Sequence, residues 1–345
     1  MVALRQYAFV SNGGSHTVTV VDLDGFRVVR TVPVGRDPTG VTASPVRQEV
    51  YVVNTGSGSV SVLNAESLAV EATIPVGRSP FSIALSHDGR TGYVANAGSG
   101  NVSIVAFETR RVVQTIAAGR GPGEARISPD GSLLAVSNRD DGTVSLLDLG
   151  QMVKVADVPV GREPGPMAIL PDSSQLFVAN AGSENISAVD LRAAKLITHL
   201  AAGRTPADMA LKPDGGELFV PNFDSDSVTV INTYADEVAL HLMAGSKPGR
   251  AIVDASGTFL YVSNFGSNNV SVVRIFDRRV VASLSVGNRP DALQLTPDGR
   301  YLLVLNTLSN DMAVVDTSVH SLVTLVPVGI SPRDVAVKVF QDAGE

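Results

Sequence analysis

The sequence predicts an all-β protein that forms a single eight-bladed β-propeller, with four antiparallel strands in each blade. Two observations lead to this fold class. An asparagine at the end of an aromatic-Val-x-Asn motif, or a close variant of it, recurs every 42 residues. Each interval holds four short apolar stretches separated by turn residues, which is the pattern of one propeller blade. Eight such repeats cover 336 of the 345 residues, so we expect one domain over residues 1–345. The motif asparagines are Asn12, Asn54, Asn96, Asn138, Asn180, Asn222, Asn264 and Asn306.

The repeat from residue 176 to residue 215 shows the four elements in order. Residues 176–180 are an apolar run closed by a turn, and residues 186–190 alternate between apolar and polar side chains, as a half-buried strand does. Residues 196–200 form the next strand and lead to the Gly-Arg-Thr-Pro loop of residues 203–206. Residues 207–212 form the last strand and run into a Pro-Asp-Gly turn, where Gly215 supplies the positive φ.

Composition excludes several classes of protein. There is no cysteine, which rules out disulfides, thiolate catalysis and cysteine-ligated metal sites. The net charge of −7 disfavours binding to nucleic acid through the phosphate backbone. No apolar run approaches the ~20 residues needed to cross a bilayer. The first residues lead directly into a strand, so we expect no signal peptide in this chain.

Four recurring motifs together resemble those of the YVTN family of β-propellers, over essentially the whole chain. They are aromatic-Val-x-Asn, Val-Ser-Val-x-Asp, Val-Gly-x-x-Pro and Ser-Pro-Asp-Gly. The resemblance implies that the strand after Val-Gly-x-x-Pro is innermost and that the strand ending in Val-Gly lies at the rim. It also implies a periplasmic or cell-surface location. The wider relatives include lactonases, a streptogramin lyase and the haem-binding domain of nitrite reductases.

This strand order predicts how the ring closes. The chain begins at the second strand of a blade, residues 7–12, and ends after an innermost strand, residues 334–339. The first blade should therefore take its inner strand from the C-terminus, which leaves no unpaired edge in the closing blade.

We interpret two kinds of residue as structural, because they recur in most or all repeats. The motif asparagines precede turns and are expected to cap the backbone. The aspartates of the Pro-Asp-Gly turns are expected to do the same on the opposite face. We therefore sought candidate site residues where single repeats depart from the pattern.

The loops after the rim strands carry the first candidates, an arc of arginines at the channel mouth. Three repeats lack this arginine but have Lys247, Arg289 or Arg333 close by. Such an arc would attract an anionic ligand. Alternatively, each guanidinium hydrogen-bonds carbonyls of the adjacent blade, or pairs with neighbours such as Asp37 and Glu163. The five arginines are Arg36, Arg78, Arg120, Arg162 and Arg204.

Polar outliers on the innermost strands are the second group of candidates. Arg126 and Gln294 occupy positions that are mostly small and apolar in other repeats, and Glu124 and Asp208 are the expected partners of Arg126. The group either lines a polar funnel that binds a small ligand or a metal, or forms a paired network around a wet channel. Its members are Glu124, Arg126, Asp208, Arg250, Gln294 and Asp334.

Phe223 and Phe265 follow the motif asparagine in adjacent repeats and are the third group, a stacking platform or a protein-contact patch. Of the five histidines, only His16 falls on the mouth face, and no pair has the spacing of a metal site or a general base.

The pattern favours a non-catalytic, monomeric scaffold that presents its channel mouth to a small anionic ligand or a protein partner. No insertion interrupts the repeats, whereas catalysis usually calls for longer loops. We expect no catalytic residue, no cofactor, no nucleic-acid partner and no membrane span, and the sequence identifies no metal. The alternative is an enzyme or cofactor-binding propeller, lactonase-like or haem-binding-like, that uses the arginine-rich mouth. A third possibility is a self-assembling surface component.

Overall fold

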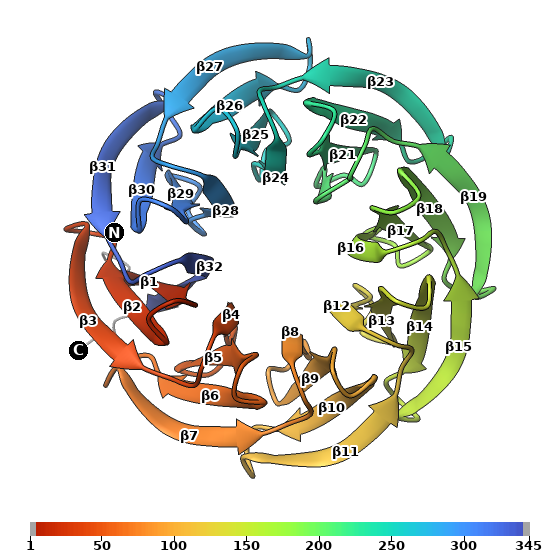
Figure 1. The fold of residues 1–345 in the computed structure, drawn as a ribbon, viewed down its shortest axis with the longest axis horizontal. Coiled ribbons are helices and arrows are strands. Elements are labelled where there is room, and N and C mark those ends of the chain that lie inside the picture. Colours follow the sequence, from red (N-terminus) through yellow and green to blue (C-terminus); the bar gives the residue numbers. More distant parts are fainter. Residues whose placement is uncertain (1–4, 341–345) are drawn as a thin grey trace.

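The computed structural model describes residues 5–340, in which 32 strands and no helix are found. The strands form eight four-stranded antiparallel sheets, arranged as the blades of a closed ring (Figure 1). The prediction of an eight-bladed, all-β propeller is therefore confirmed. Blade 1 consists of β32, β1, β2 and β3, and blades 2 to 8 follow as consecutive groups of four strands from β4 to β31.

Each blade runs from an innermost strand near the ring axis to an outermost strand at the rim (Figure 1). The innermost strands are β4 (Pro38–Ala43), β8 (Pro80–Leu85), β12 (Pro122–Ile127), β16 (Pro164–Ile169), β20 (Ala210–Leu211), β24 (Pro248–Val253), β28 (Pro290–Leu295) and β32 (Pro332–Phe340). The second strands, which end at the motif asparagines, are β1 (Arg5–Asn12), β5 (Glu49–Asn54), β9 (Thr91–Asn96), β13 (Leu133–Asn138), β17 (Gln175–Asn180), β21 (Glu217–Asn222), β25 (Phe259–Asn264) and β29 (Tyr301–Asn306).

The two outer positions of each blade complete the list. The third strands are β2 (Thr17–Asp22), β6 (Ser59–Asn64), β10 (Asn101–Ala106), β14 (Thr143–Asp148), β18 (Asn185–Asp190), β22 (Ser227–Asn232), β26 (Asn269–Arg274) and β30 (Asp311–Asp316). The outermost strands are β3 (Arg27–Pro33), β7 (Ala69–Pro75), β11 (Arg111–Ala117), β15 (Val153–Pro159), β19 (Lys195–Ala201), β23 (Glu237–Met243), β27 (Arg279–Ser285) and β31 (Ser321–Pro327). This order confirms that the strand after Val-Gly-x-x-Pro is innermost.

The ring closes as the strand order predicts. The C-terminal strand β32 pairs antiparallel with β1, with Phe9 opposite Ala336, and becomes the innermost strand of blade 1. The first and the last strand of the described chain therefore lie in the same blade (Figure 1). Lys338 adds a second link, because its buried ammonium donates to the carbonyls of Ser44 and Arg47 in the β4–β5 turn of blade 2.

The hydrophobic core is divided among the spaces between neighbouring blades. Eight apolar clusters are found, and each is built from two adjacent blades. Both faces of the second and third strands are thus covered, which explains why they are buried almost end to end. This is also why residues 176–179 read as a continuous apolar run and not as an alternating one.

Blade 6 departs from the expected pattern at its innermost strand. The sequence predicts a strand over residues 207–212, but β20 covers only Ala210–Leu211, with an isolated bridge between Pro206 and Asn222. The reason is Pro221 in the neighbouring strand β21, which has no N–H to donate to the inner strand.

Candidate functional site

Two sets of loops at one end of the strands form the face on which the candidate residues lie. Each interblade loop, which joins the outermost strand of one blade to the innermost strand of the next, is bonded to the loop after the motif asparagine. The N–H of Thr55, for example, donates to the carbonyl of Asp37, and that of Phe265 donates to Lys247. We call this face the mouth face. The eight interblade loops have the same length up to their proline. In each of them, the residue directly before the proline has a φ between 47° and 64°.

Seven of the eight interblade loops expose one cationic side chain on the mouth face, and next to the eighth loop Arg333 does so from the start of β32. The predicted arc of five arginines covers five consecutive loops, and one cation near the equivalent position covers each of the other three. We call these eight residues the cation collar. Its members, all exposed, are Arg36, Arg78, Arg120, Arg162, Arg204, Lys247, Arg289 and Arg333.

The partners of the collar arginines are partly those expected. Arg162 and Arg204 donate to the carbonyls of Gly182 and Asp224, at 2.7 and 2.6 Å. Arg120 forms an ion pair with Asp141, and the hydrogen bond between them raises the pKa of Arg120. No ion pair joins the other seven collar residues to a carboxylate within residues 5–340.

The polar outliers on the innermost strands lie closer to the ring axis and are paired with one another. Arg126 pairs with Glu124 on its own strand, at 2.7 Å, whereas Asp208 pairs with Arg250 in the next blade, at 3.5 Å. Asp291 lies 4.0 Å from Arg250 on the other side. We call the set of Glu124, Arg126, Asp208, Arg250, Asp291, Gln294 and Asp334 the inner belt. Gln294 stands apart from these pairs, since its amide donates to the carbonyl of Leu295.

Three belt carboxylates also have a structural role that the sequence analysis missed. Each accepts a hydrogen bond from a backbone N–H on the innermost strand of the following blade. Glu124 accepts from Met167 at 2.8 Å, Asp208 from Ala251 at 3.0 Å and Asp334 from Val41 at 3.0 Å. The donor always lies 43 residues further on around the ring, but the donor is a backbone group, so no residue type in the sequence marks it.

Burial and neighbouring charges shift the pKa values of three residues in the inner belt. Burial raises the pKa of Glu124, although Arg126 opposes the rise. Burial likewise raises the pKa of Asp334 to about 6, against the hydrogen bond from Val41. The pKa of Arg250 is raised, mainly by Asp208. The pKa values of these belt residues therefore depend on burial, on the neighbouring charges and on hydrogen bonds from backbone N–H groups.

The structure brings Phe223 and Phe265 together on the mouth face. Their ring centroids are 5.6 Å apart, with the planes tilted by 56°. Lys247 Nζ lies 5.2 Å from the centroid of Phe223, and the guanidinium of Arg289 lies 5.1 Å from that of Phe265. Two members of the cation collar therefore cover the aromatic pair through cation–π contacts.

His16 is exposed on the mouth face, and one of its two ring nitrogens is engaged. Its Nδ1 lies 3.1 Å from the backbone nitrogen of Asp37, from which it accepts a hydrogen bond. In blades 6, 7 and 8 the equivalent position holds Asp226, Asn268 and Asn310, whose side-chain oxygens accept the corresponding N–H. His16 thus takes over a loop-stabilising contact that is repeated around the ring.

The motif asparagines are structural, as predicted, but they bind more than a local turn. The Asn180 side chain is fully buried, and its Nδ2 donates to Ser187 and Asn185, both at 2.9 Å. Its Oδ1 accepts the N–H of Gly161 in the interblade loop, at 3.1 Å. A Cβ on Gly161 would lie 2.6 Å from the Asn180 Cβ. The loop glycine and the motif asparagine, 19 residues apart, therefore form a lock that the sequence analysis did not identify.

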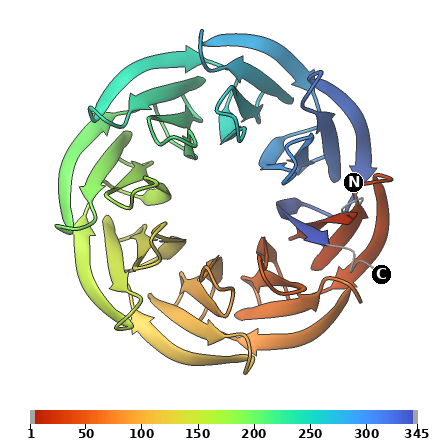
Figure 2. The same cartoon turned by 180° about the vertical axis from the view of Figure 1, so that it is seen from behind.

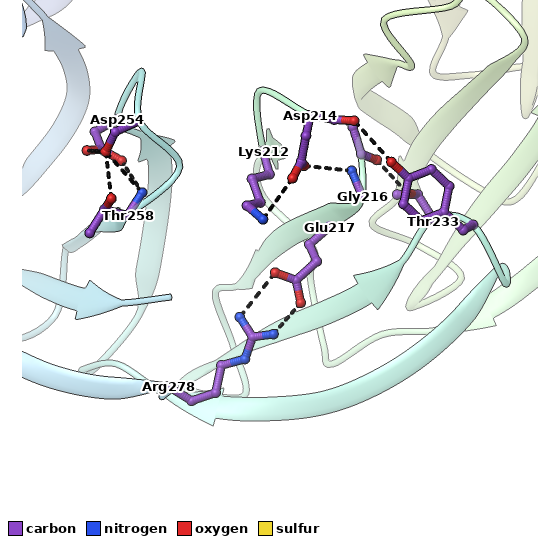
Figure 3. Close-up of polar contacts among 11 residues, drawn as sticks. Lys212, Asp214, Gly216, Glu217, Thr233, Asp254, Thr258 and Arg278 are labelled. Atoms are coloured by element: carbon purple, nitrogen blue, oxygen red, sulfur yellow. Dashed lines mark hydrogen bonds and ion pairs between the residues drawn. The ribbon is translucent and has the colours of Figure 1, made fainter. Parts of the chain in front are cut away.

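The opposite face carries ion pairs between blades that the sequence analysis also missed. Glu217 at the start of β21 accepts two hydrogen bonds from Arg278 of blade 7 (Figure 3). Nearby, Asp214 of the Pro-Asp-Gly turn accepts from Lys212 and from the N–H of Gly216, and the Lys212 contact lowers the pKa of Asp214 (Figure 3). The turn aspartates thus act as the scaffold residues that the sequence predicts.

Two hollows lie between neighbouring blades. One of about 440 Å³ lies between blades 1 and 2 and extends from the outer strands to Gly35 and Ser57 in the loops of the mouth face. The other, of about 350 Å³, lies between blades 5 and 6, beside Tyr234 on the opposite face. Within residues 5–340, no three His, Asp or Glu side chains are grouped closely enough to hold a metal ion. The same part of the chain has no helix of the length and apolarity that a membrane span requires.

Comparison with known proteins identifies similar folds. The chain is 24% identical to a structure of hydrazine synthase from Kuenenia stuttgartiensis, with a TM-score of 0.65, over 82% of this chain and 96% of that one. It is 19% identical to dihydro-heme d1 dehydrogenase NirN in complex with DHE, with a TM-score of 0.82, over 96% and 74%. A functionally unknown protein from Desulfotomaculum acetoxidans is 14% identical, with a TM-score of 0.66, over 96% and 98%. At these identities the likeness shows the fold alone.

A family model describes the sequence more directly. No curated protein sequence matches the chain significantly. The model of the YNCE-like beta-propeller matches residues 42–341, which is most of the chain. The narrower resemblance to YVTN repeats stays a prediction. This protein belongs to the YNCE-like β-propeller family.

Proposed function

We propose that this propeller is a non-catalytic binding platform whose mouth face takes an anionic ligand through the cation collar. The observation that carries the proposal is the collar itself. Seven of the eight interblade loops expose a cation on one face, and Arg333 directly after the eighth adds another, although the whole chain has a net charge of −7. Exposed guanidinium groups without carboxylate partners suit carboxylate and phosphate groups, which they bind in a two-pronged manner.

The inner belt is less suited to an anion than the collar. Its two arginines are already paired with belt carboxylates, and Asp334 and Asp291 add further negative charge. An anion at the belt would have to displace these pairs, whereas the collar arginines Arg162 and Arg204 need only exchange a backbone carbonyl. The collar is therefore the better contact surface.

The regularity of the loops supports binding without catalysis. All eight interblade loops have one length and the same positive φ before the proline, and each is bonded to its blade. Such loops form a fixed surface and not a lid that closes over a substrate.

The test is binding of inorganic tripolyphosphate, measured by isothermal titration calorimetry at two salt concentrations. The collar variant Arg162→Gln with Arg204→Gln should bind at least about tenfold more weakly, and binding should weaken with salt. The control is Arg111→Gln with Arg192→Gln, which removes two exposed arginines from outside the mouth face. Equal binding by the collar variant and the wild type would contradict the proposal. Loss of binding in Arg126→Ala with Arg250→Ala alone would place the anion at the belt instead.

A further inference from the structure

The outermost strand of blade 8 differs from the other seven in its charge. An outermost strand has one unpaired edge, and charged side chains on such strands prevent them from associating with other chains. The strands β3, β7, β11, β15, β19, β23 and β27 each carry at least one Arg, Lys, Asp or Glu. The strand β31, with the sequence SLVTLVP, carries none. Blade 8 therefore lacks a protection that the rest of the rim has.

A cross-strand pair in blade 8 has also lost its polar character. Leu325 on β31 is 45% exposed and lies opposite Ala313 on β30. In the other blades every residue at the position of Leu325 is polar, namely Thr31, Thr73, Thr115, Asp157, His199, His241 and Ser283. Every residue at the position of Ala313 is Ser or Thr, namely Thr19, Ser61, Ser103, Ser145, Ser187, Thr229 and Ser271. Two paired positions have thus become apolar in one blade only.

The exposed apolar surface continues onto the two neighbouring blades. The strands β27, β31 and β3 follow one another along the rim, as both views of the ring show (Figures 1 and 2). Blade 7 adds exposed valines and Phe276, which is 95% exposed, and blade 1 adds two more valines. We call this sector the apolar rim. Its exposed apolar residues are Val28, Val29, Phe276, Val280, Val281, Val319, Leu322, Val323 and Leu325.

We propose that the apolar rim is a self-association surface, through which two copies of this chain bind side by side with their β31 strands antiparallel. A second copy fits because the strand is its own complement. If a two-fold axis passes between Val323 and Thr324, Leu322 of one copy lies opposite Leu325 of the other. The symmetry produces this contact two times in the dimer. The absence of charge on β31 removes the like-charge repulsion that any other rim strand would meet on pairing with itself.

The same arrangement limits the contact mainly to β31. With the two-fold axis parallel to the ring axis, the rim of blade 7 in one copy faces the rim of blade 1 in the other, and the curvature of both rings carries these blades away from the contact (Figure 1).

The contact is expected to be weak and made through side chains. The register shifts between Val314 and Val315 leave Val323 as a bulge in β31, so its edge does not continue as a regular sheet. Two convex rims also bury a small area, and interfaces below about 1,200 Å² are typically transient. We expect a dimer that dissociates in the micromolar range, in contrast to the monomer expected from the sequence.

The experiment exchanges residues between blades on opposite sides of the ring. Blade 4 carries Lys154 and Asp157 at the positions of Leu322 and Leu325, where they form an ion pair of 2.6 Å. The double variant Leu322→Lys with Leu325→Asp therefore introduces side chains that the same scaffold already holds. The control is Val155→Lys, which adds a charge to the rim of blade 4 at the position equivalent to Val323.

Sedimentation velocity over about 1 to 500 µM protein gives the readout. The wild type and Val155→Lys should shift from monomer to dimer with increasing concentration, and the double variant should stay monomeric with an unchanged melting temperature. The proposal would be overturned by a wild type that is monomeric at every concentration. It would also be overturned if the control Val155→Lys stayed monomeric like the double variant.

The absence of cysteine allows a second, independent test. Val323→Cys should form a disulfide-linked dimer under mild oxidation, because two-fold symmetry brings the two residues at this position close together. Val155→Cys is the matched control, since Val155 is the bulged and exposed residue of β15. Equal cross-linking of the two variants would show random collision and refute the proposed contact.

Discussion

The lock between the loop glycine and the motif asparagine predicts a specific cost for one methyl group. In Gly161→Ala the new Cβ would lie 2.6 Å from both the Cβ and the Cγ of Asn180. Asn180 is fully buried and its amide makes four hydrogen bonds, so the side chain has no free space into which to move. Either the interblade loop moves outward or the asparagine loses part of its hydrogen bonding.

The magnitude follows from these two responses. Overpacking costs about 1–3 kcal/mol, and each hydrogen bond lost costs about 1 kcal/mol, while replacing glycine lowers the entropy of the unfolded chain by about 0.5–1 kcal/mol. With one hydrogen bond lost, we therefore expect a net destabilisation of about 1–3 kcal/mol. At about 2 °C per kcal/mol for a large domain, the melting temperature should fall by about 2–6 °C.

The matched control lies four residues away. A Cβ on Gly165 would meet nothing within 4 Å, and its φ is not positive, so Gly165→Ala should leave stability unchanged or raise it slightly. Thermal unfolding followed by circular dichroism compares both variants with the wild type. Equal melting temperatures for the two variants would refute the reasoning, because they differ only in what the added methyl group contacts.

Three further outcomes are expected. Burial raises the pKa of Asp334 from an ordinary 3.8 to about 6, so its protonation stabilises the folded state fully below 3.8, and this contribution is lost as the pH rises through about 6. The melting temperature of the wild type minus that of Asp334→Asn should therefore increase as the pH is lowered from 7.5 to 4.5, and a constant difference would contradict the role of this carboxyl. Lys338→Met should cost about 1–3 kcal/mol in denaturant unfolding, since it leaves two carbonyls of the β4–β5 turn without their donor. A double-mutant cycle with Glu217→Ala and Arg278→Ala should give a coupling free energy of about 1 kcal/mol, and additive effects would mean that the pair does not join blades 6 and 7.

The fold could be predicted because the repeat constrains it many times over. One interval of 42 residues, seen eight times, leaves no room for other elements, and the position of the chain ends within the repeat determines the closing blade. The short strand β20 also has a cause in the sequence, which is Pro221 in β21. The effect of this proline depends on which neighbouring strand would have accepted the missing N–H. That neighbour is known only once the strands have been placed.

The contacts of the candidate site were less predictable. The pair Glu124–Arg126 lies on one strand, so the period of the strand is enough to suggest it. The pairing of Asp208 with Arg250 depends on how far a side chain reaches into the next blade, and the hydrogen bond from Met167 to Glu124 joins a side chain to a backbone group. A sequence pattern carries no information on backbone partners of this kind.

The repeats provide an internal control for deciding which departures from the pattern concern function. Glu124, Asp208 and Asp334 depart from the pattern, yet each holds a backbone N–H of the next blade, so stability alone accounts for them. The apolar pair of Ala313 and Leu325 gives up polar contacts that other blades make, such as the bond between Ser187 and His199, and Leu325 remains exposed. A departure that removes a stabilising contact and exposes apolar surface has no explanation within the isolated ring. The rim of blade 8 is therefore a stronger candidate than the inner belt for a surface that binds a second molecule.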